Sequence, residues 1–137
     1  MDSEIEVSVF KEDSLGNDDA VAIAEKIKKG ELSASLVTQD AIERAKAVNP
    51  KLNAIAVENF DLAQTNSKKP FSGFFQGVPT FIKDTDEVPG LPLYLGSRSL
   101  PGEPSDKYSK AAKQIIDTGL NCLGTTSTPE FGLTGTT

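Results

Sequence analysis

The spacing of apolar side chains predicts a helix close to the start of the chain. Between residues 18 and 29, apolar side chains recur at the i, i+3, i+4 and i+7 positions of one helical face, namely Ala20, Ile23, Ala24 and Ile27. Asn17, Asp18 and Asp19 offer an N-cap, and the two aspartates suit the positive end of the helix dipole. Gly30 suits the C-terminal cap. The residues before this helix, 1–16, alternate at Ile5, Val7 and Val9. This pattern fits either a short strand or an acidic lead-in.

A second apolar stripe, from Val37 to Val48, predicts another helix. We expect Ser33 or Ser35 to cap its start. We expect it to stop at Asn49-Pro50, because the residue before a proline avoids helical backbone. These two helices carry no side-chain pattern that suggests chemistry, so they are interpreted as scaffolding.

The middle of the chain alternates between strand and helix patterns. Residues 54–57 (Ala-Ile-Ala-Val) predict a short buried strand, and residues 60–69 predict a brief helix. Residues 77–82 predict a second strand, in which Pro79 must lie near the start because proline donates no ladder hydrogen bond. Residues 86–104 hold seven Gly and Pro residues, which predicts a long surface loop.

A third helix and a third strand are expected after this loop. Ser105 is the predicted cap of a helix through Thr118, with four apolar residues facing inward, Ala111, Ala112, Ile115 and Ile116. Residues 120–124 follow as a strand. A strand, loop, helix and strand in this order form a βαβ unit, which predicts parallel pairing with a right-handed crossover and an α/β fold.

Composition removes several classes of function. The 137 residues contain no His and one Cys, so a His-dependent catalytic triad, a His-ligated metal and a thiolate zinc cage are all excluded. The net charge of −6 argues against binding to nucleic acid or to an anionic membrane. Residues 1–6 lack the features of a signal peptide, and no apolar stretch approaches the roughly 20 residues of a membrane span. We therefore expect a cytoplasmic protein without a metal or cofactor.

The strongest candidate for chemistry is Lys83, which with Asp84 directly follows the second predicted strand. Ligand sites in α/β sheets gather at the carboxyl ends of strands, and a lysine desolvated there can serve as a base near neutral pH. The competing interpretation is a structural lysine that pairs with Asp84, Asp86 or Glu87. Spacing alone does not exclude either.

Two further segments allow a functional and a structural interpretation. The loop at 86–104 is either the wall or lid of a pocket or a plain surface connection. The Thr-rich segment at 125–137 offers hydroxyls and amides for a polar substrate, with Thr126, Ser127 and Thr128 as candidates, but it also fits a flexible terminus. The single Cys122 lies within a predicted strand and is interpreted as a buried, inert thiol.

Four short motifs in order resemble the amidase signature family. They are Gly77-Val78-Pro79-Thr80-Phe81-Ile82-Lys83-Asp84, then Gly90-Leu91-Pro92, then Gly96-Ser97, and finally the run from Gly124 to Gly132, which ends in Pro-Glu-Phe-Gly. The segments around Gly30-Glu31-Leu32 and Asn49–Ala54 also look like the two N-terminal helices and first strand of that family. The resemblance covers roughly residues 17–137.

The resemblance implies amide-bond hydrolysis by a Ser-Ser-Lys triad. Lys83 would be the lysine, the base that activates a bridging serine, which in turn serves the nucleophilic serine. Backbone amides would stabilise the oxyanion. Both serines of the family lie beyond Thr137, in a Gly-Ser-rich run that is absent here. The implied fold is therefore the N-terminal part of an amidase-signature domain at 17–137, after a lead-in at 1–16, within a larger mixed sheet flanked by helices.

Because the two serines of the family are missing from this sequence, several functions stay open. The chain is expected to be an N-terminal fragment or one chain of an amidase, inactive alone. Its expected partners are a small or peptide-like amide substrate and the remainder of the enzyme, in the same or a complementing chain. The alternatives are a non-enzymatic amidase-derived module that docks a partner through its acidic first helix and unpaired strand edges, or a truncated non-functional product. A nucleotide-binding domain is disfavoured, because no phosphate-binding glycine motif follows any predicted strand.

Overall fold

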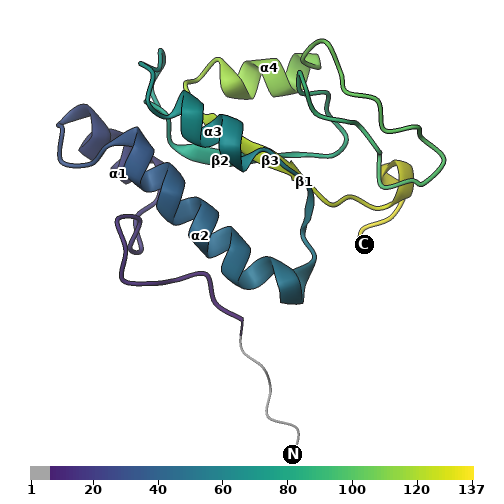
Figure 1. Ribbon diagram of the computed structural model, residues 1–137, viewed down its shortest axis with the longest axis horizontal. Helices are drawn as coiled ribbons and strands as arrows, with labels where there is room; N and C mark the ends of the chain where they lie inside the picture. Colours follow the sequence, from purple (N-terminus) through teal and green to yellow (C-terminus); the bar gives the residue numbers. More distant parts are fainter. Residues whose placement is uncertain (1–6) are drawn as a thin grey trace, which may run out of the picture.

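A computed structural model describes residues 7–137 of the chain (Figure 1). Its helices are α1 (Ala20–Lys28), α2 (Ala34–Leu52), α3 (Phe60–Asn66), α4 (Lys110–Ile116) and the short 3-10 helix η1 (Glu130–Gly132). Its strands are β1 (Ile55–Glu58), β2 (Pro79–Lys83) and β3 (Asn121–Thr126). The predicted order of elements and the α/β class are confirmed.

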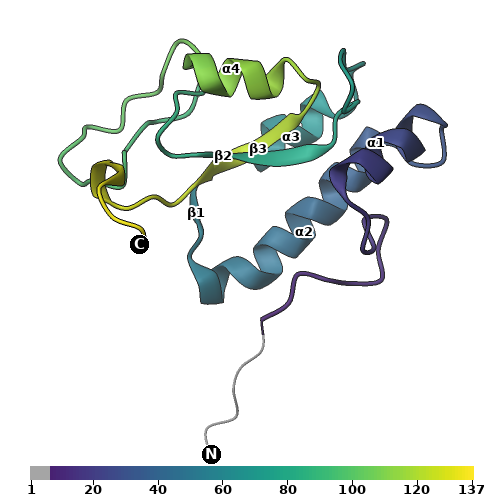
Figure 2. The same cartoon turned by 180° about the vertical axis from the view of Figure 1, so that it is seen from behind.

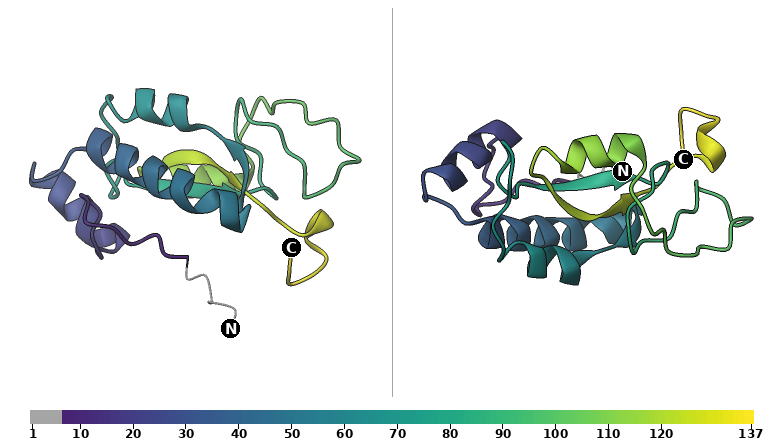
Figure 3. Two further views of the ribbon diagram at one scale, coloured as in Figure 1. Left: turned by 60° about the horizontal axis from the view of Figure 1, so that its bottom comes forward. Right: turned by 90° about the horizontal axis from the view of Figure 1, so that it is seen from above.

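The three strands form one mixed sheet in the order β1-β3-β2. β3 pairs with β2 in parallel, as the βαβ pattern predicted, and with β1 antiparallel. Because neighbouring residues of a strand face opposite sides, Cys122 packs with Ala112 of α4, while Leu123 packs with α2 and α3. Helices α2 and α3 therefore cover one face of the sheet and α4 covers the other (Figures 1 and 3).

Helix α1, at Ala20–Lys28, lies within the predicted span of 18–29. The Asp19 side chain accepts a hydrogen bond from the Ala22 amide at 2.8 Å, which is the expected N-cap. Gly30 has a φ of 76°, in the left-handed region that glycine occupies without strain. Ile23 and Ala24 are buried on the predicted apolar face.

Helix α2 extends past the predicted stop at Asn49-Pro50 and ends at Leu52. Pro50 lies in the last turn, and its fixed φ is compatible with helix, so only one amide donor is lost there. The Asn49 side chain stabilises this end, because its oxygen accepts from the Ala54 and Ile55 amides at 2.9 and 3.0 Å. The helix stops instead at Asn53, whose φ of 48° is left-handed.

Two other predictions about local structure were wrong in part. The strand predicted at 54–57 was expected to be buried, but β1 lies at the edge of the sheet and its alternate residues are exposed. Helix α4 is capped by Ser109, because Ser105 is held elsewhere: its amide donates to the Leu91 carbonyl and its hydroxyl to Glu87.

The short helix α4 buries less of its predicted apolar face than expected. Of the four residues expected to face inward, Ala112 is buried and Ile116 is half-buried, whereas Ala111 and Ile115 are exposed. A helix of seven residues that lies on one face of a sheet contacts it along a narrow stripe, so its flanking side chains remain accessible.

The end of the expected lead-in packs against the helices. Leu15 is buried in a cluster with Val37 of α2 and Val78. The Arg44 guanidinium of α2 binds both carboxylate oxygens of Asp13 at 2.7 and 2.5 Å. Residues 7–9 are not in a strand, and Ile5 lies outside the described residues. The folded part therefore begins before residue 17.

No helix among residues 7–137 is long and apolar enough to cross a membrane.

Candidate functional site

Lys83 is the last residue of β2, at the carboxyl end of the parallel pair of strands. Its register partner on β3 is Thr126, so both residues lie at the same end of the sheet. The Lys83 side chain is exposed. The three ion pairs among residues 7–137 do not include it. The pairing with Asp84, Asp86 or Glu87 is therefore absent among the described residues.

Asp84 is turned away from solvent, although it follows Lys83 directly. It is 1% exposed. Its carboxylate accepts hydrogen bonds from the amides of Tyr94 at 3.1 Å and Gly96 at 3.2 Å. Its own amide donates to the Thr126 carbonyl at 2.9 Å. Asp84 thus joins the end of β2 both to the long loop and to the end of β3.

The three hydroxyl residues predicted to bind substrate have different surroundings. Thr126 is half-buried opposite Lys83. The Ser127 hydroxyl donates to the Asn53 carbonyl at 3.0 Å. Thr128 is 3% exposed, and its hydroxyl has no hydrogen-bond partner among the described residues. Of the three, Thr126 alone combines access with proximity to the lysine in the sheet register.

The loop at 86–104 is irregular, as predicted, and it packs against the segment that follows β3. A Cβ at Gly96 would lie 2.2 Å from the Thr128 carbonyl oxygen, so only glycine permits this contact. The buried Ser97 hydroxyl donates to the Glu130 carboxylate at 2.6 Å, and the Phe131 amide donates to the Leu95 carbonyl at 2.7 Å. Figure 2 shows this loop beside the C-terminal segment.

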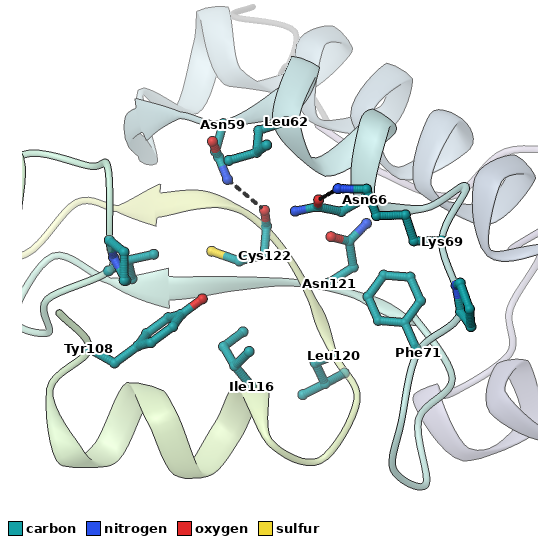
Figure 4. A pocket seen from close by; sticks show the side chains of 13 residues that line it. Asn59, Leu62, Asn66, Lys69, Phe71, Tyr108, Ile116, Leu120, Asn121 and Cys122 are labelled. Carbon is teal, nitrogen blue, oxygen red and sulfur yellow. Dashed lines mark hydrogen bonds between the residues drawn. The ribbon is translucent and has the colours of Figure 1, made fainter. Parts of the chain in front are cut away.

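A cavity of about 230 Å³ lies away from Lys83, between α3, α4 and the start of β3 (Figure 4). The Asn59 side chain donates to the Cys122 carbonyl at 3.2 Å at its wall. Burial raises the pKa of the Cys122 thiol, and burial likewise raises the pKa of Tyr108. A raised thiol pKa lowers the thiolate fraction, which agrees with the predicted inert cysteine. Within residues 7–137, no group of three or more His, Cys, Asp or Glu side chains is placed to hold a metal ion.

Comparison with known proteins identifies the family. The profile of the family described as Amidase matches residues 36–137, which is more than half of the chain. The chain belongs to the Amidase family. The resemblance read from the four motifs is thereby confirmed.

Relatives within the Amidase family are much longer than this chain. The putative amidase AmiC of Mycobacterium bovis is 41% identical over 128 residues, which cover 92% of this chain and 27% of that protein. The 6-aminohexanoate-cyclic-dimer hydrolase of Paenarthrobacter ureafaciens is 33% identical over 117 residues, with coverage of 83% and 24%. A crystal structure of a bacterial aryl acylamidase of the amidase signature family superposes with a TM-score of 0.77 at 28% identity, with coverage of 88% and 27%. This amidase chain spans about a quarter of their lengths.

The sequence interpretation of the amidase motifs missed the contacts between them. Asp84 was considered only as a partner for Lys83, and the pair formed by Ser97 and Glu130 was not predicted. The signal was present, because each of these residues lies inside one of the four motifs. Motif order alone does not reveal which motifs touch.

Proposed function

We propose that this chain supplies the lysine-bearing N-terminal part of an amide hydrolase. Membership of the Amidase family supports the reaction class. The relatives that it matches include a putative amidase and a cyclic-dimer hydrolase. The span of about a quarter of their length supports the further proposal that the two serines of the triad lie in the part of the enzyme not covered here.

Lys83 is the proposed base of a Ser-Ser-Lys triad. The observation that carries this role is the position of Lys83 at the carboxyl end of β2, with its amine exposed and Asp84 engaged elsewhere. An amine must be neutral to accept a proton, and removal of water around it favours the neutral form. The serine-bearing part of the enzyme would therefore both cover Lys83 and present the bridging serine to it.

The proposed substrate is a small or peptide-like amide. Thr126 is its proposed contact on this chain, because it lies opposite Lys83 in the sheet register. The other proposed partner is the remainder of the amidase, in the same or a complementing chain. The expectations of a cytoplasmic location, and of no binding to nucleic acid or membrane, stay predictions.

The test compares the chain alone with the chain plus the serine-bearing remainder. Residues 1–137 alone are expected to hydrolyse no amide, because both proposed serines of the triad lie in the part of the enzyme not covered here. In the completed enzyme, Lys83→Ala should lower kcat by roughly a hundredfold or more, the usual contribution of a general base. Lys107→Ala, at another exposed lysine, is the matched control and should leave kcat unchanged. Full activity of Lys83→Ala would refute the triad assignment.

A second candidate is a non-enzymatic interaction module derived from an amidase. It is supported by the sheet order, since β1 and β2 each pair with β3 alone and present an outer edge among the described residues. A coding sequence that continues past Thr137 to the two serines would favour the hydrolase. A stop codon with no complementing chain would favour the module or a truncated, non-functional product.

A further inference from the structure

The carboxylate of Asp84 organises a loop rather than the neighbouring lysine. Both of its oxygens accept from backbone amides of the loop, one from Tyr94 and one from Gly96, at 3.1 and 3.2 Å. A hydrogen bond to an ionised acceptor is stronger than one between neutral groups. Because the carboxylate is 1% exposed, little water competes for these two bonds. Asp84 therefore fixes the backbone of the loop between residues 94 and 96.

This part of the loop in turn holds the segment after β3. The Leu95 carbonyl, between the two amides bound by Asp84, accepts from the Phe131 amide at 2.7 Å. The next residue, Gly96, packs on the Thr128 carbonyl. The Ser97 hydroxyl then donates to Glu130 at 2.6 Å. Three consecutive loop residues thus contact the segment at 128–131, and the two segments run side by side in Figures 1 and 2.

We propose that Asp84 is a positioning residue, which through loop residues 94–97 holds the segment at 126–131 in place beside Lys83. The proposal rests on the proposed function, in which Lys83 is the base. Asp84 forms no ion pair with Lys83. Its effect on the lysine is therefore exerted through the backbone: the Asp84 amide joins β2 to the Thr126 carbonyl, and its side chain joins the same point to the loop.

Residue 84 must carry a carboxylate to bind both loop amides. An asparagine has the same shape but one acceptor oxygen, and its amide nitrogen is a donor. In Asp84→Asn, one loop amide would therefore face a donor instead of an acceptor. The matched control is Asp106→Asn, at an exposed aspartate that forms no hydrogen bond with Asp84, Tyr94 or Gly96 among the described residues. It makes the same chemical change and leaves both Asp84 hydrogen bonds in place.

The first measurement is amide hydrogen exchange of residues 1–137, read by nuclear magnetic resonance. Asp84→Asn should raise the exchange rates of Tyr94, Gly96 and Phe131 by roughly tenfold or more through local opening, with the Leu123 amide unchanged. Asp106→Asn should change none of them. A uniform rise at all slowly exchanging amides would mark Asp84 as an ordinary core residue and overturn the proposal. Unchanged exchange at Phe131 would also overturn it.

A second variant keeps the proposal testable if Asp84→Asn does not fold. Glu130→Ala removes an exposed side chain and breaks the hydrogen bond from Ser97, which joins the loop to the segment after β3. It should raise exchange at Phe131 while Tyr94 and Gly96 keep their protection. If exchange at Phe131 stays unchanged in Glu130→Ala, the loop does not hold the segment after β3, and the proposal is overturned.

The completed enzyme separates this proposal from the proposed function. Asp84→Asn should lower kcat by about tenfold or more, because misplaced groups lose the advantage of orientation. Lys83→Ala should remove nearly all activity. If Lys83→Ala stays active, the proposed function fails whatever the exchange data show. If Lys83→Ala is inactive and Asp84→Asn retains its full kcat, the positioning role alone fails.

Discussion

The ion pair between Asp13 and Arg44 tests whether the residues before α1 belong to the fold. The Arg44 guanidinium binds both Asp13 oxygens, at 2.7 and 2.5 Å, and also donates to the Gly16 carbonyl at 2.9 Å. The two side chains are only 15% and 12% exposed. Hydrogen bonds to charged groups contribute about 1.5–3 kcal/mol each, and exposed ion pairs contribute about 0–1 kcal/mol. A forked, largely buried pair should therefore have a coupling energy of about 2 kcal/mol.

The assay is a double-mutant cycle with Asp13→Ala, Arg44→Met and the double variant, followed by urea unfolding. Each single variant should lower the free energy of unfolding by about 2 kcal/mol, or roughly 6–10 °C in melting temperature for a chain of this size. The control cycle uses Lys113 of α4 and Asp117, the C-cap of that helix, whose side chains are 61% and 59% exposed. Its coupling should stay below about 0.5 kcal/mol. Equal coupling in the two cycles would refute the reasoning.

The same pair has a definite pH dependence. Hydrogen bonding from Arg44 lowers the pKa of Asp13 below its ordinary value. A carboxylate with a lowered pKa in the folded state stabilises the fold above its unfolded pKa, and the contribution is lost as the pH falls through the folded pKa. The difference in stability between the wild type and Asp13→Ala should thus be constant above about pH 5 and shrink below about pH 4. A difference that persists at pH 2 would contradict an ionic origin.

Three further predictions concern other parts of the chain. Gly96→Ala should destabilise more than Gly90→Ala: both have a positive φ, but only Gly96 would place its Cβ 2.2 Å from a backbone oxygen, and equal unfolding free energies would refute this. Leu123→Ala, at a buried residue, should cost about 2.5–5 kcal/mol in urea unfolding, whereas Leu133→Ala at 81% exposure should cost almost nothing. Because burial raises the pKa of the Cys122 thiol, a disulfide reagent at pH 8 should react slowly until the chain is unfolded; rapid reaction in the native state would contradict its burial.

Local patterns predicted most of the elements, and they failed at two helix ends. Pro50 was expected to end α2, but a proline in the last turn removes only one amide donor, and the helix ends instead at Asn53 with a left-handed backbone. Ser105 had the local features of a helix cap, but Glu87, 18 residues earlier, takes its hydroxyl. For Ser105, a hydrogen bond to a residue distant in sequence outweighed a cap preference of about 1 kcal/mol.

The candidate site likewise contains one feature that the sequence predicts and others that it does not. Lys83 at a strand end could be predicted, because strand periodicity and the following polar residues are local features. The burial and contacts of the residues near Lys83 could not be predicted from the sequence. Adjacent residues of a strand point in opposite directions, so Lys83 is exposed while Asp84 is buried under the loop. Thr126 is half-buried at the end of β3, whereas Thr128, beyond the strand, is buried where Gly96 of the loop packs on its carbonyl.

The sequence by itself therefore determined the order of elements, the α/β class, the family motifs and the position of Lys83. Hydrophobic periodicity, helix caps and turn residues act over a few neighbouring positions. The order of elements and the position of Lys83 depend only on such local signals. The tertiary structure decided that β1 pairs antiparallel with β3, that Asp84 binds the loop, and that Ser97 meets Glu130 across 33 residues. Such contacts depend on how the sheet, the helices and the loop pack together. Packing decides which polar groups are buried side by side, and buried polar groups usually form hydrogen bonds with each other.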